Sequence, residues 1–205
     1  PVEIVVVAPS SWMEPARELA ERVVGTKASV AVVSGGATRT DSVRAGLVAV
    51  SDKAQIVLVH DAARAFTPAE VFDRVIGAVE AGSAGVIPVL DVTDTIVPVD
   101  NSSLTAAAVD RTKLRAVQTP QGFDAATLRA SYDAFSGDAT DDAEVLRHAG
   151  HEVIAVPGHP TATRSPTPPI WSPQRERSAT VLNFGWEPRS MCTNSTMTLP
   201  SSWEV

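Results

Sequence analysis

The sequence predicts an α/β fold in which helices cover a mostly parallel sheet. The chain has 205 residues, a length typical of one domain, and its 44% hydrophobic and 20% charged residues are ordinary for a soluble globular protein. Short apolar segments rich in β-branched residues alternate with segments of helical periodicity. Such alternation is typical of βα units, whose parallel strands are buried between helices.

Five segments are expected to form strands, because each is a short apolar run with turn-forming residues near its ends. These strands are residues 2–8, 29–33, 55–60, 85–90 and 152–156. Helical periodicity occupies the stretches between them. The expected helices are residues 15–24, 41–50, 67–79, 125–135 and 140–149.

Local signals mark the ends of three of these helices. Thr67 to Glu70 reads as a capping box, with Pro68 at the first helical position. Asp124 is suited to cap the helix that follows it. Gly150 is suited to end the last helix, because glycine adopts the left-handed conformation common after a helix C-terminus.

Composition excludes several classes of protein. The formal net charge of −7 disfavours a nucleic-acid-binding protein, although a few local cations still allow an anionic substrate. A single cysteine, Cys192, excludes an intramolecular disulfide framework. The sequence has no apolar run long enough to span a membrane and no signal-peptide pattern, so we expect a cytoplasmic enzyme.

The two ends of the chain differ from its middle. Residues 163–205 contain three of the four tryptophans, six of the fifteen prolines and the only cysteine, without a regular period. We therefore expect a folded domain over residues 1–162 and a poorly ordered tail over 163–205. The chain opens directly with a core strand, which suggests a fragment; a processed or trimmed start is the alternative.

In parallel sheets, ligands bind at the carboxyl ends of strands, where loops lead into helices. Gly35 and Gly36 follow one expected strand, and Ser42 lies in the first turn of the next helix. Free backbone N–H groups at that helix start are suited to phosphate. A simple tight turn is the alternative reading of this segment.

Charged residues also follow the expected strand 55–60. Asp61 is suited to hold Mg²⁺ through its carboxylate, and Arg64 to grip a phosphate with its guanidinium. The alternative is an Asp–Arg pair that only ties down the loop. His60 is expected to be structural, because it adjoins the strand.

Residues 91–123 do not fit a simple βα unit. The span Ile96–Asp110 is too long for a hairpin turn and too short for a crossover that contains a helix. We expect an extended β-arm over about 92–118 that leaves the domain, as arms that dock on another subunit do. Further on, Asp138 to Asp142 form a capping cluster, in which a plain capping role is favoured for Asp141 and Asp142.

Six motifs occur in a fixed order: Gly-Gly-x-x-Arg-x-x-Ser-Val, Val-His-Asp-Ala-Ala-Arg, Pro-Val-x-x-x-x-Asp-Thr, Val-Asp-Arg, Gln-Thr-Pro-Gln-x-Phe and Thr-Asp-Asp-Ala. With them, residues 1 to about 162 resemble the 2-C-methyl-D-erythritol 4-phosphate cytidylyltransferase family. The resemblance implies a Rossmann-like nucleotidyltransferase fold and a homodimer formed through the β-arm. It also implies cytidylyl transfer from CTP to methylerythritol phosphate with Mg²⁺, releasing pyrophosphate, in non-mevalonate isoprenoid biosynthesis.

The resemblance also implies roles for individual residues. The implied nucleotide-binding residues are Gly36, Ala37 and Ser42 at the cytidine, Ala62 at the ribose, and Asp61 at Mg²⁺ and the triphosphate. The implied substrate pocket contains Arg64, Thr95, Thr119 and Thr140. Arg111 is implied to reach from the arm into the partner's site, and the implied catalytic residues are Asp61, Arg64 and Arg111.

The sequence departs from the family at both ends. A glycine-rich loop of the type Ala-Ala-Gly-x-Gly-x-Arg, followed by Pro-Lys, has no counterpart, so we expect the first βα unit to be missing and activity to be impaired. The family's Lys-Ile-Thr near the C-terminus is replaced from Thr163 on, and our hypothesis for this difference is a one-nucleotide frameshift in the gene. Two alternatives stay open: a cytidylyltransferase for another sugar-alcohol phosphate, such as ribitol 5-phosphate, and a non-catalytic remnant that only dimerises.

Overall fold

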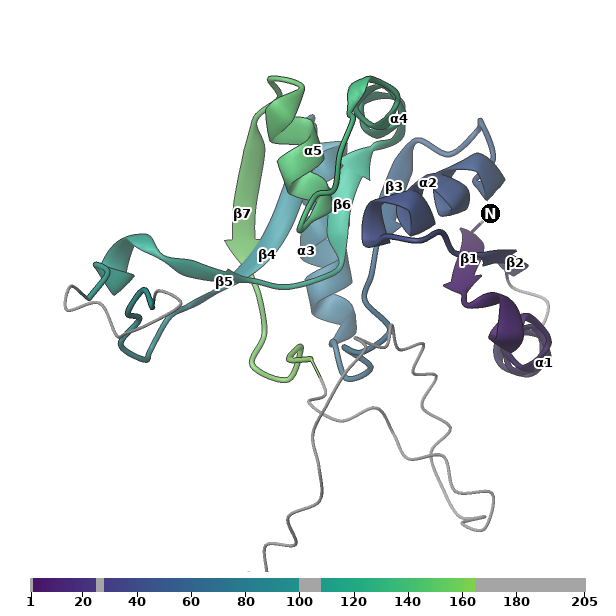
Figure 1. Ribbon diagram of the computed structural model, residues 1–205, viewed down its shortest axis with the longest axis horizontal. Helices are drawn as coiled ribbons and strands as arrows, with labels where there is room; N and C mark the ends of the chain where they lie inside the picture. Colours follow the sequence, from purple (N-terminus) through teal and green to yellow (C-terminus); the bar gives the residue numbers. More distant parts are fainter. Residues whose placement is uncertain (1, 25–27, 100–107, 165–205) are drawn as a thin grey trace, which may run out of the picture.

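A computed structural model of the chain describes residues 2–24, 28–99 and 108–164 (Figure 1). Almost all of the predicted tail lies outside these residues. The first sheet consists of β1 (Val2–Ala8) and β2 (Ala28–Ser34), which pair in parallel along their whole length. The short helix η1 (Ser10–Trp12) and α1 (Met13–Val24) connect them.

The second sheet has five strands. They are β3 (Ile56–Val59), β4 (Gly85–Asp91), β5 (Arg115–Val117), β6 (Gln121–Asp124) and β7 (Val153–Pro157). Strand β6 lies between β3 and β4 and is antiparallel to both. The end of β4 pairs with β5 in antiparallel orientation, and β7 pairs with β4 in parallel.

The sheet is therefore mixed, whereas the sequence predicts one that is mostly parallel. Strands β3, β4 and β7 do point the same way, as expected for βα units. The two additional strands, β5 and β6, run against them. Each is only three or four residues long and contains no apolar alternation, so periodicity does not reveal it.

One glycine explains how β6 fits into the middle of the sheet. A side-chain carbon on Gly122 would lie 2.3 Å from Cγ1 of Val75 in α3 (Ala69–Glu80). Only a residue without Cβ allows the helix to pack so closely on this strand. The same glycine makes β6 look unlike a strand in the sequence, since glycine is disfavoured there.

The remaining helices are α2 (Arg39–Ala49), α4 (Ala125–Ala134) and α5 (Asp142–His148). Asp124 caps α4, because its carboxylate accepts a hydrogen bond from the N–H of Thr127 at 2.8 Å. Gly150 follows α5 with a φ of +86°, as predicted for a residue after a helix end. The predicted capping box does not form: Pro68 is the N-cap of α3, and the Thr67 hydroxyl donates to the Arg64 carbonyl instead.

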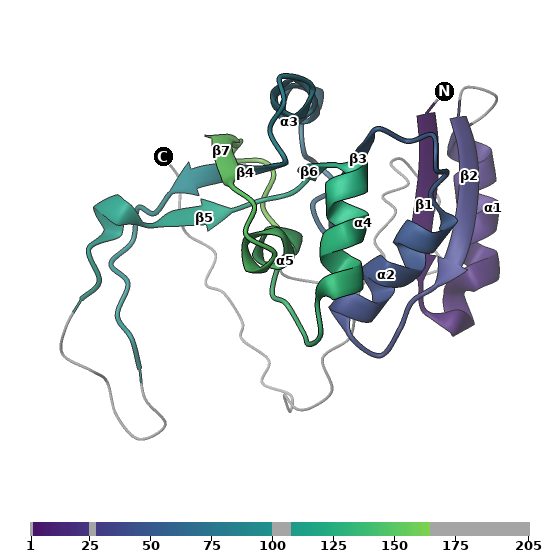
Figure 2. The same ribbon diagram turned by 90° about the horizontal axis from the view of Figure 1, so that it is seen from above.

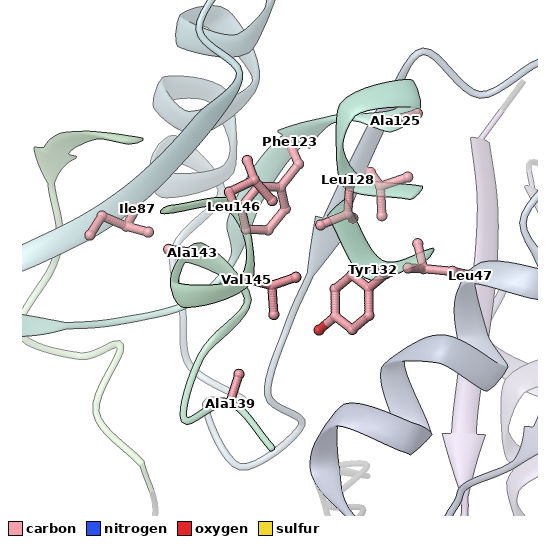
Figure 3. Packing of buried hydrophobic residues seen from close by; sticks show 11 residues of the cluster. Leu47, Ile87, Phe123, Ala125, Leu128, Tyr132, Ala139, Ala143, Val145 and Leu146 are labelled. Atoms are coloured by element: carbon pink, nitrogen blue, oxygen red, sulfur yellow. The ribbon is translucent and has the colours of Figure 1, made fainter. Parts of the chain in front are cut away.

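Helices cover both faces of the second sheet. Figure 2 shows α3 on one face and α4 and α5 on the other, with α2 leading toward the first sheet. Figure 3 shows the larger core, where Phe123, Leu128 and Leu146 are completely buried between β6, α4 and α5. Burial of a side chain of this size contributes about 1.5–3 kcal/mol, so this contact fixes α5 and the loop before it.

The two sheets are not hydrogen-bonded to each other within the described ranges. There, β1 pairs only with β2, and β3 pairs only with β6. Both sheets nevertheless share α2, which contacts β1 and β2 and contributes Leu47 to the larger core. The absence of a first βα unit stays a prediction.

An extended segment leaves the domain between β4 and β5 (Figures 1 and 2). Its described parts join where the N–H of Val109 donates to the carbonyl of Ile96 at 2.8 Å. Several of its apolar side chains are exposed in the single chain: Ile96, Val97, Val99 and Val109. No helix of the described residues is long and apolar enough to cross a membrane.

Candidate active site

A pocket of about 410 Å³ opens at the carboxyl ends of β3 and β7. It lies where parallel strands of an α/β sheet are expected to bind a ligand. Its lining residues come from the loops after these strands, from the turn before β6, and from the starts of α2 and α5: Arg39, Asp61, Arg64, Val117, Gln118, Thr119, Gln121, Thr140, Asp141 and Arg164. Three arginines and two aspartates give this lining an excess of one positive charge.

Asp61 is the carboxylate nearest the exit of β3. Its Oδ2 lies 2.6 Å from Nη2 and 3.0 Å from Nε of Arg164, and 3.5 Å from Nε of Arg64. The side chain is 18% exposed, so it is partly open to the pocket. The backbone N–H of Asp61 donates to Oγ1 of Thr119 at 3.0 Å, which fixes the loop against the turn before β6.

Arg64 is buried and holds three segments of the site together. Its Nη1 donates to the carbonyl of Ala162 at 2.6 Å, and Nη2 to the carbonyl of Val117 at 3.3 Å. Its Nε is buried without a hydrogen-bond partner among the described residues. Burial lowers the pKa of Arg64 from its ordinary value, and the negative charge of Asp61 partly opposes this. Arg64 therefore ties down the loop, as the alternative reading holds, and also lines the pocket.

His60 supports Thr119 from behind the pocket. Nδ1 of His60 lies 3.1 Å from Oγ1 of Thr119, and the imidazole packs against the ring of Phe72 with centroids 5.2 Å apart. Burial lowers the pKa of His60 from its ordinary value. The neutral ring is therefore favoured, in keeping with a structural role for this residue.

The start of α5 supplies the opposite wall. The Asp141 carboxylate caps the helix by accepting from the N–H of Glu144 at 2.7 Å. Thr140 is held by Glu144, whose Oε2 accepts from the backbone N–H and the hydroxyl of Thr140 at 2.8 and 2.9 Å. Gln121, only 1% exposed, donates to Oδ2 of Asp141 at 3.3 Å and accepts from the N–H of Ala143 at 3.2 Å. The wall is thus anchored to the central strand β6.

Four of the residues singled out from the sequence meet in this pocket: Asp61, Arg64, Thr119 and Thr140. They come from separate loops, so only the fold brings them together. The other candidates do not line it: Gly36, Ala37, Ser42, Ala62, Thr95 and Arg111. Their roles stay predictions.

The predicted nucleotide segment forms a tight turn. The N–H of Gly36 donates to Oγ of Ser42 at 3.1 Å, and this hydroxyl donates to the carbonyl of Thr38 at 2.9 Å. A side-chain carbon on Gly36 would lie 2.3 Å from Cβ of Asp41, so the turn requires glycine. The segment therefore forms the tight turn that was the alternative interpretation. Ligand binding at this turn stays a prediction.

The two candidates on the extended segment lie apart from the pocket. Thr95 is exposed near the base of the segment. Arg111 lies in η2 (Arg111–Lys113) and donates from Nη1 to the carbonyl of Thr93. Neither residue lines the pocket, and the prediction that Arg111 serves a partner subunit stays a prediction.

Sequence reasoning did not identify the pairing of Arg39 with Asp142 next to the pocket. Arg39 lines the pocket, and both terminal nitrogens of its guanidinium donate to Asp142. Asp142 is completely buried and does not cap α5, so the capping interpretation is correct for Asp141 and wrong for Asp142. Arg39 belongs to the glycine-containing motif and Asp142 to the Thr-Asp-Asp-Ala motif, which were the available signals.

Solved structures of similar fold define the class of protein. The crystal structure of 2-C-methyl-D-erythritol 4-phosphate cytidylyltransferase from Thermus thermophilus has a TM-score of 0.66 at 29% identity, over 82% of this chain and 94% of that one. The 4-diphosphocytidyl-2C-methyl-D-erythritol synthase from Anaerococcus prevotii has a TM-score of 0.71 at 26% identity, over 80% and 73%. The fold is that of an α/β cytidylyltransferase.

Sequence comparisons define the family. Residues 2–169 match the family model described as 2-C-methyl-D-erythritol 4-phosphate cytidylyltransferase. Proteins of that name from Rhodococcus jostii and Saccharopolyspora erythraea are each 48% identical to the chain, over 80% of its length and 70% and 73% of theirs. The chain belongs to the 2-C-methyl-D-erythritol 4-phosphate cytidylyltransferase family.

Proposed function

We propose that the protein transfers the cytidylyl group of CTP to 2-C-methyl-D-erythritol 4-phosphate and releases pyrophosphate. The observation that carries this proposal is the pocket at the strand ends, where Asp61, Arg64, Thr119 and Thr140 converge. Membership of the family supplies the identity of both substrates.

The chemistry is an attack by a phosphate oxygen of the alcohol substrate on the α-phosphorus of CTP. Both reactants are anions, so catalysis consists of alignment and charge neutralisation. The pocket suits this task, because its arginines outnumber its aspartates. Donors fixed in advance stabilise the developing charge without further rearrangement.

In this proposal Arg64, Thr119 and Thr140 bind methylerythritol phosphate. Arg64 is held in place by the carbonyls of Val117 and Ala162, so little side-chain entropy is lost on binding. Thr95 and the partner's Arg111 complete this site, which makes a homodimer part of the proposal. The exposed apolar side chains of the extended segment support such an association.

On the nucleotide side, Gly36, Ala37, Ser42 and Ala62 are proposed to contact the cytidine and ribose. Asp61 is proposed to hold Mg²⁺, which when bound would neutralise phosphate charge. Its partly exposed carboxylate fits such an ion, because Mg²⁺ is usually bound through one or two carboxylates together with substrate phosphates. The role of Asp61 within the protein is to place one negative charge beside Arg64 and Arg164.

The test is an assay of the purified chain with CTP, MgCl₂ and methylerythritol phosphate. The expected products are the cytidine diphosphate alcohol, followed by chromatography, and equimolar pyrophosphate, formed slowly because the activity of this chain is expected to be impaired. Ribitol 5-phosphate serves as the matched alternative substrate and should react far more slowly. Faster turnover of ribitol 5-phosphate, or no turnover together with no binding of either substrate, would contradict the proposed function.

A further inference from the structure

Asp142 is a buried carboxylate that serves no helix cap. It is completely buried, and three donors point at it: Nη1 of Arg39 at 3.0 Å, Nη2 of Arg39 at 2.5 Å and the hydroxyl of Tyr132 at 2.5 Å. A carboxylate is taken out of water at a large cost unless it is paired and hydrogen-bonded. The pairing with Arg39 is bidentate, the geometry that fixes a guanidinium most tightly.

This cluster joins three helices: Arg39 begins α2, Tyr132 lies in α4 and Asp142 begins α5. Burial by itself would lower the pKa of Arg39, but the hydrogen bonds and charge of Asp142 raise it above its ordinary value. Burial, followed by the charge of Asp142, raises the pKa of Tyr132. Both donors therefore keep their protons, and Arg39 keeps its charge.

Arg39 also faces the pocket. Its side chain is 30% exposed, and it lines the pocket together with Arg64, Thr119 and Thr140. Asp142 accepts one hydrogen bond from each terminal nitrogen of Arg39. The other N–H groups of the guanidinium do not bond to Asp142. The side chain of Arg39 is partly exposed at the pocket, which allows a ligand to reach the guanidinium.

Arg44, five residues further along α2, is an arginine that contacts α4 but lies outside the pocket. Its Nη2 donates to the backbone carbonyls of Tyr132 and Phe135 in and after α4, and it does not line the pocket. Arg44 ties α2 to α4 and lies over the ring of Tyr132, 5.8 Å from its centroid. Arg39 differs in being held by a buried negative charge at the edge of an open pocket that already contains Arg64.

We propose that Arg39 is an anion-binding residue of the pocket, which donates to a phosphate oxygen of the alcohol substrate. Asp142, supported by Tyr132, is the positioning residue that holds the guanidinium toward the pocket. This inference rests on the proposed function, because it takes methylerythritol phosphate as the ligand. The pair of Arg39 and Asp142 would link the start of α2, on the nucleotide side of the site, to the start of α5, on the substrate side.

The test measures the dissociation constant of methylerythritol phosphate by calorimetry with the full chain and three variants. Arg39→Gln is expected to weaken binding by at least about tenfold, the loss typical of a hydrogen bond to a charged group. Arg39→Lys, which keeps the charge but not the planar guanidinium, should lose less affinity than Arg39→Gln. Arg129→Gln is the control: Arg129 donates to the carbonyls of Leu47, Val50 and Ser51 and does not line the pocket, so this variant should bind as the unmodified chain does.

A double-variant cycle separates positioning from general stabilisation. Because Asp142→Asn can prevent folding, Tyr132→Phe is the milder change that removes one hydrogen bond to Asp142. It should weaken binding about threefold alone and add nothing in the Arg39→Gln background, since it acts through Arg39. A loss that persists in that background would overturn the positioning role.

Two negative outcomes are distinguishable. No binding of methylerythritol phosphate by the unmodified chain would overturn the proposed function itself. Normal binding by the unmodified chain and equal binding by Arg39→Gln, with circular dichroism confirming both folds, would overturn only the role of Arg39.

Discussion

The Asp61 carboxylate and the Arg164 guanidinium meet at 2.6 Å across 103 residues of sequence, at the mouth of the pocket. The pair closes the loop after β3 against the segment after β7. Arg164 is the more exposed partner, with 61% of its side chain accessible, while Asp61 is mostly covered. Arg164, the last residue that the structure describes, therefore brings a positive charge to the pocket.

Arg164→Gln should weaken binding of methylerythritol phosphate with little effect on stability. The change removes the excess positive charge of the pocket lining, which holds three arginines and two aspartates. An exposed ion pair contributes only about 0–1 kcal/mol to stability, so the thermal midpoint should move little. Calorimetric titration and thermal unfolding of the same preparation check both parts. Unchanged affinity would show that Arg164 does not serve the ligand.

Asp61→Asn should reduce turnover by at least about 10²–10³ while leaving the fold intact. The carboxylate is lost, but the backbone N–H that donates to Thr119 is kept. The measurement is initial rate of pyrophosphate release at saturating Mg²⁺, with circular dichroism as the control for folding. Near-normal activity would refute the assignment of Asp61 to the metal side.

Thr119→Val should destabilise the protein by about 1–3 kcal/mol, because it leaves the N–H of Asp61 without its acceptor in a partly buried loop. Thr119→Ser keeps the hydroxyl and is the matched control. Urea unfolding at equilibrium gives the free energies of unfolding of both variants. If valine and serine were equivalent, the Thr119 hydroxyl would have no role in holding the loop.

Gly122→Ala should destabilise the protein by about 1–3 kcal/mol through overpacking. The new methyl carbon would lie 2.3 Å from Cγ1 of Val75, well inside van der Waals contact. Gly77→Ala, in the facing helix α3, is the opposite case, because nothing lies within 4 Å of its new carbon. It should stabilise by about 0.5–1 kcal/mol, since alanine is the better helix former. Chemical denaturation of the two variants should therefore give shifts of opposite sign.

Asp124 should contribute to the dependence of stability on pH in acid. Hydrogen bonds from Thr127 lower the pKa of Asp124 in the folded chain. The unfolded chain therefore binds the proton more readily, so this stabilisation is present above the ordinary aspartate pKa and is lost as the pH falls through the lower, folded value. Asp124→Ala should cost about 0.5–2 kcal/mol at neutral pH, the usual loss for a helix cap.

The control for this prediction is the same comparison at low pH. The difference in free energy of unfolding between Asp124→Ala and the unmodified chain should shrink as the pH falls below the ordinary aspartate range. A difference that stays constant with pH would mean that the charge of Asp124 does not act through its cap. Equilibrium denaturation over a series of acidic buffers measures it.

Much of the fold follows from local patterns. The five strands predicted from apolar runs, β1 to β4 and β7, lie within one residue of their expected bounds, because each is a short apolar run between turn-forming residues. Strands β5 and β6 were missed, because they exist only through pairing with β4 and β3. The predicted capping box at Thr67 does not form for a similar reason, because the Thr67 hydroxyl donates a hydrogen bond to the Arg64 carbonyl within the loop.

The sequence by itself determined the order of βα units and the placement of Asp61 and Arg64 in the loop after an apolar strand. Both depend on periodicity and chemistry within a few neighbouring residues. Only the tertiary structure decided that Asp142 turns inward to Arg39, 103 residues away, rather than capping its own helix. The physical reason is that a buried carboxylate requires a cation, and which cation reaches it depends on how the core packs α2 against α4 and α5.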